Sequence, residues 1–344
     1  MKKNKIFAIA GILLALGCGS VFAKKAKAET NKLKVVTTIF PEYDWARQVI
    51  GENADNVELT FLLDNGVDLH SFSPSVKDIA KIQEADIFVY VGGESDEWVD
   101  EVLKNVKKPN QKVINLLEVL GDKVKAEEIV EGMQHEHHHH DEHGHDDHDD
   151  DDEHEHHEEH HHEEEEELDE HVWLSLKNAQ ILTGAITSAL CEVDAKNAEV
   201  YKKNLASYNA KLDALDAKYV EAVKAAGKNT LVFGDRFPFR YMVEDYNLKY
   251  FAAFTGCSAE SEASFKTIVF LSEKVNELGL NTVCQIETGN GKIAKTVISN
   301  SKNKKAKVLT FDSLQSTTAK QIKKGATYLG AMEKNLEVLK EALK

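Results

Sequence analysis

Histidine is concentrated in one short stretch of this 344-residue sequence. Fourteen of the 16 histidines lie between His135 and His162, among residues that are almost all Asp or Glu. Imidazole and carboxylate groups bind borderline divalent ions, and closely spaced histidines can chelate them without a preformed fold. A stretch with so little apolar surface should not fold by itself. Residues 135–167 therefore predict a disordered loop with several weak metal sites; the alternatives are a solubilising acidic insert or a cloning tag.

The two remaining histidines, His70 and His171, are candidates for a more specific metal site. His70 follows a predicted strand that ends near Leu63, across a predicted turn at residues 64–66, and His171 stands where the acidic stretch ends. A single histidine is more often a surface residue or a satisfied core residue than a ligand. Spacing alone therefore leaves both roles open.

The elements that must position these residues alternate between short β-branched or apolar runs and segments of helical periodicity. In the first half, strands are predicted at 34–39, 57–62 and 87–91, and helices at 42–51 and 75–85. In the second half, strands are predicted at 230–233, 250–254, 282–286 and 307–311, and helices at 239–246, 263–278 and the C-terminus. The continuous apolar run at 87–91 is typical of a strand buried on both faces of a parallel sheet.

Residues 176–226 are rich in Ala, Leu, Lys and Glu and contain no Pro, which predicts one long helix or two helices meeting near 192–194. We therefore predict an α/β fold: two small α/β lobes with parallel sheets, joined by a long helix. The predicted ranges are 30–134 and 168–175 for the N-terminal lobe, 176–226 for the linking helix and 228–344 for the C-terminal lobe. Because such sheets bind ligands at the carboxyl ends of their strands, a ligand is expected in the interlobe cleft.

Two motifs around these histidines resemble those of a known family, the metal-binding lipoproteins of zinc and manganese ABC transporters. Residues 68–75, Asp-Leu-His-Ser-Phe-Ser-Pro-Ser, are similar to the motif in which a ligand His precedes an aromatic residue and a Ser or Thr near a Pro. Residues 169–174 are similar to the Asp-Pro-His-x-Trp-Leu motif, with Glu170 in place of Pro. The resemblance spans essentially the whole chain after the leader, including the His-rich insert. It implies two α/β lobes, a long connecting helix, and a metal between the lobes bound by His70 and His171.

The same resemblance implies two further ligands in the C-terminal lobe. Asp312, after the last predicted strand, is similar to a family Asp that binds metal, although it could instead cap the following helix. The family's remaining ligand, a His or a Glu, should follow the strand that ends at Phe233, where this chain has Gly-Asp-Arg-Phe-Pro-Phe and no His. Asp235 is the nearest oxygen donor, unless it forms a structural salt bridge with Arg236. The other candidates for this ligand are Glu260, Glu262, Glu287 and Cys257.

The predicted donors bear on the identity of the metal. Two imidazoles and two carboxylates admit manganese or ferrous iron as well as zinc. The His-rich stretch favours zinc or nickel, and in the resembling family such stretches accompany zinc import. Zn²⁺ is therefore predicted, with Mn²⁺ as the alternative. Because ligand imidazoles must be neutral, binding should weaken below about pH 6.

The predicted function is to capture the metal ion outside the cytoplasm and deliver it to the membrane permease of an ABC transporter. A metal buffer or adhesin without a transport role would use the same ligands. A zinc hydrolase is the rival class, but the HExxH strings of this sequence, at residues 135–139 and 157–161, fall within the His-rich stretch that is not expected to form a helix, and there is no GxSxG elbow. We therefore expect no enzymatic activity.

The N-terminus carries the features of a secretion signal. A basic start, an apolar run over residues 6–16 and small residues up to Ala23 predict a leader over residues 1–23. The sequence Leu-Gly-Cys at 16–18 resembles a lipoprotein box, so that Cys18 could carry a lipid, whereas Val-Phe-Ala at 21–23 is an ordinary cleavage site. We expect an extracytoplasmic protein, at the cell surface or in the periplasm, attached to a membrane only through such a lipid.

Charge and cysteine content argue against other classes of protein. The net charge is −17, and residues 135–167 hold 18 of the 59 acidic residues and no Lys or Arg, which leaves 41 acidic against 42 basic residues elsewhere. No basic patch stands out, so a nucleic-acid partner is not expected. Cys191, Cys257 and Cys284 remain after the leader without CxxC spacing, so at most one disulfide can form. We expect a monomer.

Overall fold

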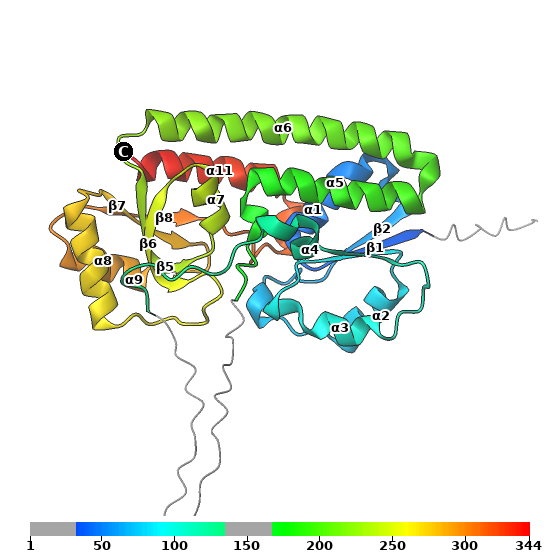
Figure 1. Ribbon diagram of the computed structural model, residues 1–344, viewed down its shortest axis with the longest axis horizontal. Helices are drawn as coiled ribbons and strands as arrows, with labels where there is room; N and C mark the ends of the chain where they lie inside the picture. Colours follow the sequence, from blue (N-terminus) through cyan, green and yellow to red (C-terminus); the bar gives the residue numbers. More distant parts are fainter. Residues whose placement is uncertain (1–31, 135–166) are drawn as a thin grey trace, which may run out of the picture. The chain divides into compact units, whose positions relative to one another are not determined.

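The computed structural model describes residues 32–134 and 167–344, and these ranges belong to one compact unit (Figure 1). The predicted leader, Cys18 and the His-rich stretch up to residue 166 lie outside the described residues. The first lobe holds a parallel sheet in the order β2-β1-β3-β4. Its strands are β1 (Leu33–Thr37), β2 (Val57–Phe61), β3 (Ile87–Tyr90) and β4 (Lys112–Asn115).

Four helices accompany this first sheet. They are α1 (Phe40–Ile50), α2 (Val76–Glu84), α3 (Trp98–Leu103) and α4 (Leu116–Leu120). Two of them begin at polar side-chain caps, Ser75 before α2 and Asn115 before α4. At the start of α2, the Ser75 hydroxyl accepts a hydrogen bond from the Asp78 N–H at 3.3 Å, and the Asp78 carboxylate accepts from the Ser75 N–H at 3.1 Å. This reciprocal cap ends the loop that carries His70, because it satisfies two backbone N–H groups at the helix start.

The second lobe repeats the architecture, with a parallel sheet in the order β6-β5-β7-β8. Its strands are β5 (Thr230–Phe237), β6 (Lys249–Thr255), β7 (Thr282–Ile286) and β8 (Lys307–Phe311). Its helices are α7 (Arg240–Asp245), α8 (Phe265–Glu277), α9 (Lys292–Asn300), α10 (Ala319–Lys323) and α11 (Tyr328–Ala342). All four predicted strands of this half are present, and β5 runs four residues further than predicted, past a shift in register between Phe233 and Arg236.

The connector consists of two helices, α5 (Leu176–Val193) and α6 (Ala198–Ala225). The helix direction changes at Asp194, whose carboxylate accepts hydrogen bonds from Asn197 and Tyr201, each at 2.7 Å. Of the two predicted arrangements, two helices meeting near residues 192–194 is therefore the one observed. Together with the two sheets, this confirms the predicted fold of two α/β lobes joined by helix.

The long helix α6 runs beside both lobes (Figure 1). Near its start, Asn204 donates a hydrogen bond to the carbonyl of Val49 in α1 at 2.9 Å. Near its end, the Tyr219 hydroxyl donates to the carbonyl of Met332 in α11 at 2.7 Å. The helix α6 is thus hydrogen-bonded to each of the two lobes. Among the described residues, no helix is both long enough and apolar enough to span a membrane.

Candidate metal centre

His70 lies in a short 3-10 helix, η2 (Leu69–Ser71), at the carboxyl edge of the first sheet. Asp68 precedes this helix, and its carboxylate accepts a hydrogen bond from the His70 N–H at 3.2 Å. Leu69 is fully buried and anchors the turn, whereas the His70 side chain keeps about 11% of its surface exposed. The turn therefore fixes the backbone of residue 70, and the imidazole ring lies beside that of His171.

His171 lies directly before a second 3-10 helix, η5 (Val172–Leu174), and is completely buried. Trp173 anchors this segment, because its indole N–H donates to the Ser313 carbonyl of the C-terminal lobe at 2.9 Å. The two imidazoles meet with their Nε2 atoms 3.1 Å apart. Two nitrogens bound to one tetrahedral zinc ion at about 2.0 Å would be separated by about 3.3 Å. The predicted pair is therefore already spaced for one ion.

A carboxylate lies at the other ring nitrogen of each imidazole. Asp169 Oδ1 lies 2.9 Å from His171 Nδ1 and also accepts the His171 backbone N–H at 2.9 Å. Glu170 Oε2 lies 3.4 Å from His70 Nδ1, which is also 2.7 Å from the Ser95 hydroxyl. Carboxylates in this position fix the tautomer and orientation of ligand histidines and increase their basicity. The Nδ1 atoms are thus occupied by acidic partners, and the two Nε2 atoms lie next to each other, where one ion could bind both.

Glu170 occupies the place where the resembling motif has Pro, and its role could not be predicted from that motif. Its Oε1 accepts the Ser95 N–H at 2.8 Å, which ties residue 170 to the loop after β3. Burial works to raise the pKa of Glu170, but its contacts with His70 and Ser95 outweigh burial and hold the pKa below its ordinary value. The side chain therefore stays anionic beside the imidazole.

Cys257 is the third side chain beside the two imidazoles. Among the described residues, one group of three or more His, Cys, Asp or Glu has all its candidate ligand atoms within 4.8 Å of one another: His70, His171 and Cys257. Cys257 follows β6, and its N–H donates to Glu127 Oε1 at 3.0 Å. Burial, with Glu127 and other nearby carboxylates, raises the pKa of its thiol.

The two predicted aspartate ligands lie outside this group. Asp312 follows β8, where Oδ1 accepts the Leu314 N–H at 2.9 Å, and burial together with Glu287 raises its pKa to about 6. Asp235 lies in β5, and its two carboxylate oxygens accept the N–H groups of Arg236 at 2.9 Å and of Ile286 at 3.2 Å.

The three glutamates predicted as alternatives also lie outside the group and have partners of their own. Glu287 accepts from the Ser313 N–H at 2.7 Å and from two serine hydroxyls. Glu262 pairs with Lys292 at 3.2 Å, and Glu260 is hydrogen-bonded to Gln134. Of the candidates for a ligand from the C-terminal lobe, the structure brings Cys257 to the histidines.

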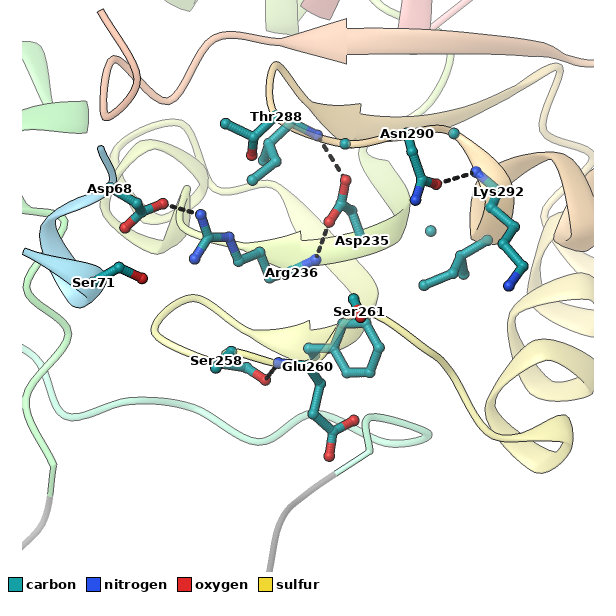
Figure 2. A pocket seen from close by; sticks show the side chains of 17 residues that line it. Asp68, Ser71, Asp235, Arg236, Ser258, Glu260, Ser261, Thr288, Asn290 and Lys292 are labelled. Carbon is teal, nitrogen blue, oxygen red and sulfur yellow. Dashed lines mark hydrogen bonds and ion pairs between the residues drawn. The ribbon is translucent and has the colours of Figure 1, made fainter. Parts of the chain in front are cut away.

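A cavity of about 270 Å³ lies at the carboxyl edge of the second sheet, next to this group. Figure 2 shows Arg236 extending from β5 to an ion pair with Asp68 of the N-terminal lobe. Its guanidinium thus pairs with Asp68 rather than with its neighbour Asp235. Burial works to raise the pKa of Asp68, but Arg236 and His70 outweigh it and hold the pKa below its ordinary value. The ion pair joins the lobes beside the turn that carries His70.

Comparison with known proteins places the chain among zinc-uptake proteins. The family model described as zinc-uptake complex component A, periplasmic (ZnuA) matches residues 35–342. The zinc-binding protein AdcA of Streptococcus pyogenes serotype M3 is 32% identical over 336 residues, which are 96% of this chain and 61% of AdcA. The high-affinity zinc uptake system protein ZnuA of Bacillus subtilis is 31% identical over 344 residues, 99% of this chain and 98% of that protein. The chain thus spans about three fifths of the AdcA relatives and nearly all of ZnuA.

Solved structures of proteins of this kind are also similar to the chain. The Zn(II)-bound ZnuA-like domain of Streptococcus pneumoniae AdcA is 28% identical, with a TM-score of 0.66 over 91% of this chain and 99% of that domain. The metal-dependent lipoprotein YcdH of Bacillus subtilis is 27% identical, with a TM-score of 0.69 over 91% of this chain and 100% of YcdH.

Proposed function

The chain belongs to the family of periplasmic zinc-uptake components, and on that premise we propose that it binds a zinc ion at His70 and His171 and delivers it to the permease of an ABC transporter. The family predicted from the two histidine motifs is thereby confirmed, and the protein acts outside the cytoplasm. The proposal is carried by one observation: the Nε2 atoms of the two histidines lie 3.1 Å apart, and a carboxylate lies at the Nδ1 atom of each ring.

The geometry supports capture of a borderline divalent ion in a site that is largely formed in advance. Each imidazole is oriented by an acidic side chain, so little side-chain freedom is lost when the ion binds. The site lies where the carboxyl edges of two parallel sheets face each other, the usual place for a ligand in such folds.

Zinc is favoured over manganese by the donors. Imidazole nitrogen suits zinc, whereas manganese prefers oxygen-rich sites. Asp312 and Asp235, the predicted carboxylate ligands, remain predictions; Asp235→Ala and Asp312→Ala variants test them in the titration described next. The family consists of metal-binding components of transporters, so we infer no catalytic role for the bound ion.

The test is a competitive zinc titration of the full chain against a chromogenic chelator, beside the same chain carrying His70→Ala and His171→Ala. The His-rich stretch is present in both proteins, so the difference between the two titrations isolates the interlobe site. We expect one tight equivalent of zinc that the double variant lacks. Identical titrations would refute the assignment of the site.

The transport role has its own measurement. Cells that depend on this protein for zinc should take up labelled zinc at limiting concentration, and cells carrying the double variant should not. Uptake that is unchanged by deletion of the whole protein would indicate a buffer or adhesin without a transport role.

A further inference from the structure

We propose that the Cys257 thiolate is the ligand from the C-terminal lobe, so that zinc is held by two imidazoles and one sulfur. This inference rests on the proposed zinc site and specifies how the second lobe takes part in it. It departs from the two carboxylates predicted from the sequence. The ion would then bridge the lobes, because both histidines belong to the segments around the first sheet and Cys257 belongs to the second.

The distances allow this arrangement with little movement. A tetrahedral zinc ion with bonds of about 2.0 Å to nitrogen and about 2.3 Å to sulfur places those two ligand atoms about 3.5 Å apart. The sulfur and the two imidazole nitrogens already lie within 4.8 Å of one another. Small changes of side-chain torsion are therefore sufficient to close the site around an ion.

Gly256 is what lets the loop after β6 come so close. A Cβ atom at this position would lie 2.9 Å from His171 Cε1, 3.1 Å from its Nδ1 and 3.1 Å from the Phe237 carbonyl oxygen. His171 cannot yield, because it is completely buried and held by Asp169. The backbone of residue 256 thus lies directly against the imidazole, and the next side chain in sequence is the thiol.

The loop is also held in place from outside. The N–H of Cys257 donates to Glu127, and the Gln134 N–H donates to the Ala253 carbonyl at 2.9 Å. Both partners come from the segment that follows α4, which crosses from the first lobe to the second. Cys257 and the end of β6 are therefore held by the segment that follows α4.

A sulfur ligand would determine selectivity. Thiolates favour zinc and other soft or borderline ions, whereas manganese prefers carboxylate and water oxygen. Three protein ligands also leave a fourth position of zinc free, as in sites where the metal must exchange a ligand. Both properties suit a protein that must choose zinc and then release it.

The experiment is to load the full chain with Co²⁺ and record its absorption spectrum, in which a thiolate ligand produces a near-ultraviolet charge-transfer band. Imidazoles and carboxylates, including those of the His-rich stretch, do not produce it. We expect the band in the wild type and in a variant that keeps only Cys257 and carries Cys18→Ser, Cys191→Ser and Cys284→Ser. We expect it to be absent in Cys257→Ser.

Zinc and manganese titrations complete the test. Cys257→Ser should weaken zinc binding by more than about a hundredfold, beyond the loss caused by removing an outer-shell partner, and manganese binding far less. Tight zinc binding by the wild type without the cobalt band would overturn the sulfur assignment and leave the proposed function intact. Failure of the wild type to bind zinc tightly would instead refute the proposed function. The spectrum of the variant that keeps only Cys257 decides the question even if Cys257→Ser does not fold.

Discussion

Exchanging the carboxylates behind the two histidines for amides should weaken zinc binding unequally. Asp169→Asn and Glu170→Gln keep the size of each side chain and an oxygen that can accept the same hydrogen bonds, but remove the negative charge. Loss of such outer-shell partners typically costs 10–100-fold in metal affinity, or about 1.4–2.7 kcal/mol. The structure indicates where in that range each variant should fall.

Asp169→Asn should lie near the upper end. The carboxylate is 2.9 Å from His171 Nδ1, and both side chains are almost completely buried, so water screens their interaction little. Glu170→Gln should cost about tenfold or less, because Glu170 is 3.4 Å from His70 Nδ1 and Ser95 remains as a closer partner at 2.7 Å. We therefore expect the order Asp169→Asn, then Glu170→Gln, then wild type, from weakest to tightest binding.

The assay is competitive zinc titration of each full-length variant, with thermal unfolding of the metal-free proteins as a check on folding. The matched control is Asp194→Asn, which makes the same chemical change at a carboxylate bonded to Asn197 and Tyr201 at the junction of α5 and α6. It should leave zinc affinity unchanged. An effect of Glu170→Gln as large as that of Asp169→Asn, or no effect of either, would refute the reasoning.

Three further outcomes are expected. Gly256→Ala should lower zinc affinity in the same titration, whereas Gly184→Ala, in α5 with no atom within 4 Å of an added Cβ, should leave affinity unchanged and stabilise the fold by about 0.5–1 kcal/mol in denaturant unfolding. Burial, together with the carboxylate of Asp96, raises the pKa of Glu42 from 4.5 to about 8. The folded protein therefore holds this proton more tightly than the unfolded chain does. The resulting stabilisation is complete below pH 4.5 and is lost as the pH rises towards 8. The free energy of unfolding should therefore fall by a few kcal/mol between pH 5 and 9, and by less in Glu42→Gln; equal slopes would contradict this. Tyr328→Phe should cost about 1–3 kcal/mol, because it leaves the buried Trp173 carbonyl without the hydroxyl that donates to it at 2.6 Å, and a smaller loss would show that the carbonyl finds another donor.

The strands could mostly be predicted from the sequence, because buried parallel strands are continuous apolar runs. All four residues of β3 are buried, and its run stands out. β4 was not predicted, since it lies at the edge of its sheet and buries only Ile114 fully. The helices α3, α4, α9 and α10 were also missed. Of these, α3, α4 and α10 have fewer than two turns, which show too little periodicity to be recognised.

The metal centre could be predicted only in part. His70 and His171 are rare histidines within recognisable motifs, so residue type and local sequence were sufficient to select the pair of imidazoles that the structure brings together. Cys257 was one of several candidates, because its position depends on Gly256 packing against an imidazole from a distant part of the chain. The role of Glu170 could not be predicted either, since its partners His70 and Ser95 lie on two other loops.

If Cys257 is the ligand from the second lobe, as we propose, the hydrogen bonds of Asp235 give a physical reason why the oxygen donor nearest in sequence does not bind the metal. The pairing of β5 with β6 shifts between Phe233 and Arg236, and the Asp235 carboxylate stabilises that irregularity by accepting the N–H groups of Arg236 and of Ile286 in β7. Turning it towards an ion would leave these donors without their acceptor, at about 1–3 kcal/mol for each donor that is buried. A thiol is a weak acceptor and has no comparable backbone donors to satisfy. Sulfur can therefore bind the ion without disrupting the sheet, which is a physical reason for the second lobe to contribute Cys257 rather than a carboxylate.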